Sequence, residues 1–91
     1  MEQTHADYMS VVERLTAIRK DKVRQYGTKR YEIADTETNL WMCYSDVYRK
    51  FIRLEEQLDR RDIKGMVETY SDMANYCIMA IQILEKQNET V

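Results

Sequence analysis

The feature that most constrains this chain is its near lack of residues that break a helix. It contains no proline and only two glycines, Gly27 and Gly65, among 91 residues. Because proline and glycine are the residues that most often end helices and form tight turns, we expect long uninterrupted helices. A chain of this length makes one small domain that buries limited surface on its own.

Local signals place the ends of three helices. Polar capping residues and one glycine mark these ends: Thr4 with Asp7, Gly27, Asp35 or Thr36, and Asp62. We therefore predict an all-α domain of three helices, at about 4–26, 36–60 and 63–87.

Apolar side chains recur at helical spacing in the second and third of these segments. The second segment carries a 4-3-4-3-4 seam of Leu40, Tyr44, Val47, Phe51, Leu54 and Leu58. The third carries a matching seam of Met66, Tyr70, Met73, Cys77, Ala80 and Leu84. Two matched seams joined by a short turn predict a long antiparallel helical hairpin, against which the first helix packs.

Further apolar side chains lie outside these seams. They are Trp41, Tyr48 and Ile52 in the second segment, and Val67, Ala74, Ile78, Met79, Ile81 and Ile83 in the third. A helix that is apolar nearly all round needs more partners than two neighbouring helices supply. We therefore predict a homo-oligomer.

Charge and composition exclude several classes of protein. Lys and Arg number 14 against 16 Asp and Glu, so no net basic field favours direct nucleic-acid binding. The apolar runs are too short to span a membrane, and the N-terminal residues do not resemble a signal peptide. Cys43 and Cys77 match no metal-ligand spacing, which favours small packed side chains in a reducing compartment. We expect a cytoplasmic protein without membrane contacts.

A polar stripe interrupts the third segment. Glu68, Asp72 and Asn75 stand at i, i+4 and i+7, which places them along one helix face. In an antiparallel hairpin, Arg53 lies across from Ala74, close to Asp72 and Asn75. Lys50 lies one turn further from the hairpin end. These groups are expected to converge on one side of the hairpin.

Two interpretations of this convergence remain open. In the first, Arg53 and Asp72 form an interhelical salt bridge and Glu68 is solvated, which is favoured because structural ion pairs are common. In the second, Lys50 and Arg53 hold phosphate oxygens while Glu68 and Asp72 bind Mg²⁺ through their carboxylates. The second arrangement suits chemistry at a nucleoside triphosphate.

Other charged groups are weaker candidates. Glu56 and Asp59 share a helix face at i, i+3, as paired metal ligands would, yet a solvated face is the favoured interpretation. His5 is a lone histidine near an end. The basic residues Lys20, Lys22 and Arg24 suit the C-terminal turn of a helix, although a phosphate could dock there.

Three segments together resemble a known family. They are "QYG", "DVYRKFIRLEEQL" and "ETYSDMANYCIMAIQIL", and they span about Lys20 to Leu84. They resemble the phage and bacterial family called nucleotide modification associated domain 1, which is similar to the MazG-like all-α nucleoside triphosphate pyrophosphohydrolases. The most specific part is the third segment, with Asp72, Ala74, Asn75, Tyr76, Ile78 and Met79.

The resemblance implies a helical, oligomeric, phage-encoded protein that handles nucleotides in the host cytoplasm. MazG-like enzymes cleave between the α and β phosphates with Mg²⁺ held by acidic residues of two helices. By this resemblance, the metal ligands would be Glu56, Glu68 and Asp72, and the nucleotide would contact Lys50, Arg53, Asn75, Tyr76 and Tyr26. Three functions remain open: a pyrophosphohydrolase, a non-catalytic protein that sequesters a nucleotide or nucleotide signal, as in anti-defence, and a purely structural interaction protein.

Overall fold

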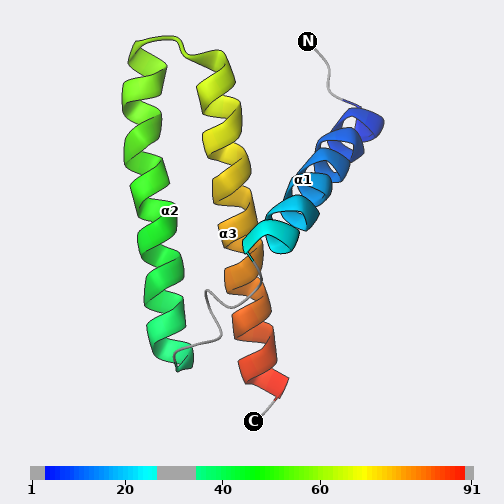
Figure 1. Ribbon diagram of the computed structural model, residues 1–91, viewed down its shortest axis with the longest axis vertical. Helices are drawn as coiled ribbons and strands as arrows, with labels where there is room; N and C mark the ends of the chain where they lie inside the picture. Colours follow the sequence, from blue (N-terminus) through cyan, green and yellow to red (C-terminus); the bar gives the residue numbers. More distant parts are fainter. Residues whose placement is uncertain (1–3, 27–34, 90–91) are drawn as a thin grey trace.

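The computed structural model describes residues 4–26 and 35–89, and this part of the chain is helical and contains no strand. Its helices are α1 (His5–Tyr26), α2 (Thr36–Asp59) and α3 (Ile63–Glu89). Helices α2 and α3 run antiparallel, side by side, and α1 leans across α3 (Figure 1). The prediction of an all-α domain with a helical hairpin is confirmed, and the predicted helix ends agree to within two residues.

The first two helices begin at the predicted capping residues. The N–H of Thr4 donates to the Asp7 carboxylate, and the N–H of Asp7 donates to the Thr4 hydroxyl, each at 3.1 Å. Asp35 has extended backbone angles and accepts a hydrogen bond of 2.8 Å from the N–H of Thr38. These side chains satisfy N–H groups that have no partner within the helix. The predicted end of α1 at Gly27 lies outside the described residues.

A short turn reverses the chain between α2 and α3. Arg60 ends α2 with its N–H bonded to the carbonyl of Glu56 at 3.2 Å. Arg61 then has a φ of 54°, in the left-handed region that reverses the chain direction. Asp62 caps α3 by accepting a hydrogen bond of 3.0 Å from the N–H of Gly65. A Cβ atom at position 65 would collide with this carboxylate, so glycine leaves room for the cap.

The surfaces through which α2 and α3 face each other are mainly polar. The buried residues are Asn39, Cys43, Asp46 and Gln57 on α2, and Thr69 and Asn75 on α3. Among the described residues, Cys43 is the only hydrophobic one in the buried class. In a single chain the fully buried positions of the hairpin are therefore polar apart from Cys43, and apolar residues such as Leu54 and Met73 are only half-buried.

The predicted apolar seam is only partly correct as the contact between the two helices, because half of its members are half-buried, namely Leu40, Val47, Leu54, Met66, Met73 and Ala80. Its members Tyr44, Phe51, Leu58, Tyr70 and Leu84 are all more than half exposed. The stripe that faces α3 instead begins one residue earlier in α2, and one residue corresponds to a rotation of about 100°. Helical spacing shows which side chains share a face, but it does not show what covers that face. Of the residues predicted to lie outside the seams, Ala74 is half-buried, and the exposed ones include Trp41, Tyr48, Ile52, Val67, Ile78 and Ile81.

Helix α1 completes the described fold with few contacts. It contacts α3 but not α2 within the described residues, and Figure 1 shows its C-terminal end crossing the middle of α3. Met79 and Ile83, predicted to lie outside the hairpin seam, are half-buried. Across residues 4–26 and 35–89, no helix combines the length and apolar character that a membrane span needs.

Candidate functional site

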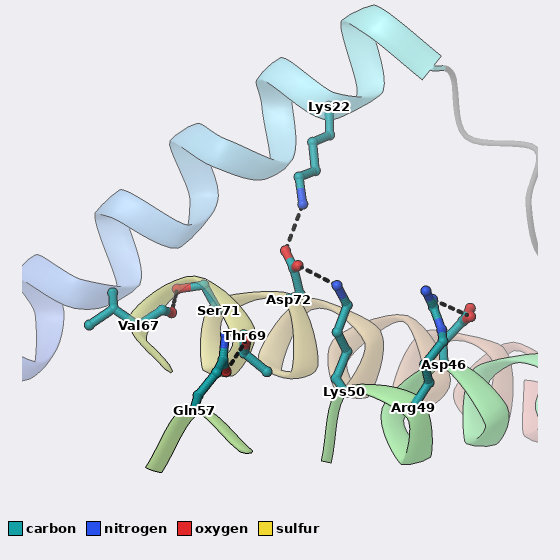
Figure 2. A network of polar contacts seen from close by, with 9 residues as sticks. All are labelled: Lys22, Asp46, Arg49, Lys50, Gln57, Val67, Thr69, Ser71 and Asp72. Carbon is teal, nitrogen blue, oxygen red and sulfur yellow. Dashed lines mark hydrogen bonds and ion pairs between the residues drawn. The ribbon is translucent and has the colours of Figure 1, made fainter. Parts of the chain in front are cut away.

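Three charged side chains from three helices meet at the middle of the hairpin. The Lys22 ammonium on α1 lies 2.7 Å from one oxygen of the Asp72 carboxylate on α3, and the Lys50 ammonium on α2 lies 3.1 Å from the other. Figure 2 shows Lys22 of α1 and Lys50 of α2 pointing toward the same Asp72 carboxylate from two different helices. We call this group the Lys22–Asp72–Lys50 cluster. It joins all three helices at one point.

Burial differs between the members of the cluster. The Lys50 side chain is 13% exposed and that of Asp72 is 22% exposed, whereas Lys22 is 47% exposed. Lys50 therefore carries its ammonium within the hairpin, while Lys22 reaches Asp72 from the solvent side. A ligand from solvent would meet Lys22 first.

The environment keeps the Asp72 carboxylate ionised. Burial is the largest single influence and raises the pKa of Asp72, but the hydrogen bonds and positive charges of Lys22 and Lys50 together outweigh it. The resulting pKa lies below the ordinary value of 3.8. At neutral pH the cluster therefore holds two ammonium groups and one carboxylate, which leaves an excess of one positive charge.

Asn75 adds a hydrogen-bond donor on the same helix, three residues after Asp72. The residue is buried, and its side-chain Nδ2 has no hydrogen-bond partner in the structure. A buried N–H donor without a partner carries a desolvation cost that a bound acceptor would remove. Tyr76, the next residue, is half-buried, and its carbonyl accepts a contact of 3.6 Å from the Cys43 thiol.

Two further polar contacts flank the cluster along the hairpin. The Thr69 hydroxyl donates to the side-chain carbonyl of Gln57 at 2.8 Å, and both residues are buried. In the other direction, the buried Asp46 carboxylate lies 3.1 Å from the exposed guanidinium of Arg49 on the same helix. Figure 2 shows these contacts on either side of Lys50. Polar contacts therefore run along the inside of the hairpin through the cluster.

The predicted pairing of Arg53 with Asp72 is wrong. Arg53 is exposed and forms no ion pair within the described residues, and Lys50 takes the inward position three residues earlier. Three residues turn a helix by about 300°, which moves Arg53 to the flank of α2. Lys22 is the partner that the sequence did not identify. Its place in a basic helix end was recognisable, but its distance of 50 residues from Asp72 was not bridged by any local signal.

The predicted metal ligands are not gathered into one site. Within the described residues, no three His, Cys, Asp or Glu side chains come together in a way that would hold a metal ion. Glu68 is exposed on α3, four residues before Asp72, and Glu56 is exposed and paired with Arg60 at 3.6 Å. Magnesium binding by these residues stays a prediction. The side chain of Tyr26, a predicted nucleotide contact, lies outside the described part of the structure.

Comparison of the chain with protein-family models, with curated proteins and with solved structures gave no match. The function is therefore inferred from the chemistry of the Lys22–Asp72–Lys50 cluster and from the three sequence segments that carry the family resemblance. That chemistry is a compact cationic excess, with a buried amide donor, Asn75, three residues after Asp72 on the same helix.

Proposed function

We propose that the protein binds a nucleotide through its phosphate groups at the Lys22–Asp72–Lys50 cluster. The observation that carries this proposal is the convergence of two ammonium groups on one carboxylate. Each ammonium has three N–H donors, so two remain on each after the contact with Asp72. Asp72 thus positions both cations while their remaining donors can bond phosphate oxygens.

Two observations support an anionic ligand at this place. The cluster has one uncompensated positive charge, and the Asn75 amide offers a buried donor without a partner. An oxygen-rich anion that accepts from all three groups would satisfy the amide and neutralise the charge. The resemblance of "ETYSDMANYCIMAIQIL" to a nucleotide-handling family favours a nucleotide over other phosphates. The ligand would be bound in the cytoplasm.

Hydrolysis of the bound nucleotide is the second candidate function. Asp72 is ionised, and Glu68 lies four residues earlier on the same side of α3. These carboxylates would supply oxygen ligands to Mg²⁺, which would polarise a phosphate or activate water when bound. Without such turnover, the protein would act by sequestering the nucleotide.

Calorimetric titration of a panel of nucleotides, with and without Mg²⁺, tests the binding proposal. Lys22→Gln removes an accessible ammonium, and loss of one charged hydrogen bond should lower affinity by tenfold or more, which is about 1.4 kcal/mol. Lys20→Gln is the matched control, because it removes the same charge two residues away on α1, where the helix turns by about 200°. The control should bind as the wild type does.

Two results would overturn the proposal: no nucleotide binds, or the Lys20 and Lys22 variants weaken binding equally. Equal weakening would indicate a diffuse electrostatic effect rather than a site. Chromatography of the products after incubation with Mg²⁺ separates the two functions. New nucleoside monophosphate and pyrophosphate would establish hydrolysis, and unchanged nucleotide in the presence of tight binding would establish sequestration.

A further inference from the structure

The chain exposes far more surface than a closed protein of its size. Its accessible surface is 7709 Å² for a mass of 11.0 kDa. A compact monomer of that mass exposes about 5,600 Å², so roughly 2,100 Å² is in excess. The radius of gyration also indicates an open shape. It is 15.0 Å, whereas about 12 Å is typical of a compact chain of this length.

Part of this surface is apolar and lies along one side of the hairpin. Lys50 and Thr69 point between the two helices, and Phe51 and Tyr70 each follow one residue later, 62% and 59% exposed. One residue turns each helix by about 100° in the same sense. Because the helices run antiparallel, equal rotations bring Phe51 and Tyr70 to the same side of the hairpin.

Helix α1 lies on the other side. Asp72, which binds Lys22 of α1, stands three residues after Thr69 and is therefore rotated by about 60° in the opposite sense. The side that carries Phe51 and Tyr70 thus faces away from α1. We call it the apolar hairpin face. Its positions, by their spacing, are Leu40, Tyr44, Val47, Phe51, Leu54 and Leu58 of α2, and Met66, Tyr70, Met73, Cys77, Ala80 and Leu84 of α3.

We infer that the apolar hairpin face packs against the same face of a second copy of this chain, forming a four-helix bundle. Both of its helices carry apolar residues at alternating spacings of four and three, the pattern that packs in such bundles. The two helices are long and of similar length, with 24 and 27 residues. A second hairpin supplies two helices with the same pattern and length.

The areas and charges fit this occupant. A standard interface removes about 800 Å² from each partner and an obligate one removes more, which the excess surface accommodates. No charged residue occupies the twelve positions of the face, so a two-fold arrangement would oppose no like charges there. The net charge of −2 per chain adds little long-range repulsion.

Sedimentation equilibrium tests the inference on the intact protein. The wild type should have twice the 11.0 kDa mass at micromolar concentration. Tyr70→Lys places a cation on the face of each copy and should yield the monomer mass. Tyr8→Lys is the matched control, because Tyr8 on α1 is 66% exposed and lies outside the face. It should remain a dimer.

The Cys77 thiol reports where the copies meet. Cys77 is exposed in the single chain and lies two turns from Tyr70 on the same stripe, whereas Cys43 is buried within the hairpin. In the wild-type dimer both thiols should react slowly with an aromatic disulfide reagent. In folded Tyr70→Lys one thiol should react at least tenfold faster. If that variant unfolds and exposes both thiols, the wild type is diluted instead to dissociate the dimer. Dilution should then lower the melting temperature and, over the same concentration range, make the Cys77 thiol reactive.

Three outcomes would overturn the inference. The first is a folded wild-type monomer at micromolar concentration. The second is a dimer in which Cys77 reacts as fast as a free thiol, since the copies would then meet elsewhere. The third is dissociation by Tyr8→Lys without dissociation by Tyr70→Lys, which would move the interface to α1.

Discussion

Replacement of Asp72 by asparagine isolates the charge of the Lys22–Asp72–Lys50 cluster. The side chain keeps its shape, but the two ammonium groups at 2.7 and 3.1 Å lose their counter-charge. Lys22 can turn toward water because it is 47% exposed. Lys50, which is 13% exposed, cannot do so without leaving the hairpin. The Lys50 ammonium therefore accounts for most of the expected loss of stability.

The magnitude lies between two measured limits. Exposed ion pairs contribute about 0–1 kcal/mol, and removal of one partner from a fully buried pair costs about 3–5 kcal/mol. Asp72 and Lys50 are mostly but not completely buried, so we expect a loss of about 1–2 kcal/mol in the free energy of unfolding at pH 7. For a domain of this size each kcal/mol lowers the melting temperature by about 4–8 °C.

The same variant makes a prediction about pH. The pKa of Asp72 is lowered in the folded chain, because the two lysines outweigh the effect of burial. A carboxylate of this kind contributes its stability above the pKa it has when unfolded, and loses it as the pH falls through the folded pKa. The difference between wild type and Asp72→Asn should therefore be complete above about pH 5 and should vanish well below pH 3.8.

Urea unfolding followed by circular dichroism, at equal protein concentrations from pH 7 to pH 2.5, measures this difference. Asp21→Asn is the control, because Asp21 also pairs with a basic residue, Arg24, but is 54% exposed within α1. It should change the free energy of unfolding by less than about 0.5 kcal/mol. Equal stability of wild type and Asp72→Asn at pH 7 would refute the argument, as would a difference that is unchanged at pH 2.5.

Two further substitutions test the hairpin and its caps. Thr69→Val removes the hydroxyl that bonds the buried Gln57 carbonyl, and unfolding in urea should show a loss of about 1–3 kcal/mol. The same change at Thr16, whose hydroxyl bonds the Val12 carbonyl on the exposed face of α1, should cost much less, and equal costs would contradict the role of burial. Asp35→Ala removes the cap of α2 and should lower the melting temperature. The backbone N–H and the hydroxyl of Thr38 bond this carboxylate and lower the pKa of Asp35. The loss of melting temperature should therefore become smaller as the carboxylate is protonated in acid. A loss that does not change with pH would contradict a role for the charged carboxylate in the cap.

Those parts of the fold that depend on local sequence were predictable. Asp35 bonds Thr38 and Asp62 bonds Gly65, each within one helical turn, so the residue types alone identify these helix ends. The absence of proline left nothing to interrupt α2 or α3. The apolar spacing indicated which side chains share a face of each helix, since periodicity is a property of one helix, but the predicted packing of the two seams against each other holds only in part.

The contacts between helices were not predictable in the same way. Neighbouring residues of a helix point in directions about 100° apart. An error of this size in the rotation of α2 therefore predicts that Phe51 faces α3, where the structure has Lys50. For the same reason Arg53 was placed where Lys50 lies. The contact of Lys22 with Asp72 depends on the path of α1 across α3. No residue within one helical turn of Lys22 or Asp72 determines that path. The site could be predicted as a region around Asp72 but not as a set of contacts.

The polar interior and the apolar exterior of the hairpin are two parts of one arrangement. Contacts such as Gln57–Thr69 and Lys50–Asp72 are directional, so they fix the register of α2 against α3, but each adds little net stability. Burial of the apolar hairpin face by a second copy would then supply the stability that the single chain lacks. Since that face lies opposite α1, assembly leaves Lys22 accessible. We therefore expect Tyr70→Lys to abolish the dimer and lower the melting temperature, while Lys22→Gln lowers nucleotide affinity and leaves the mass of the dimer unchanged.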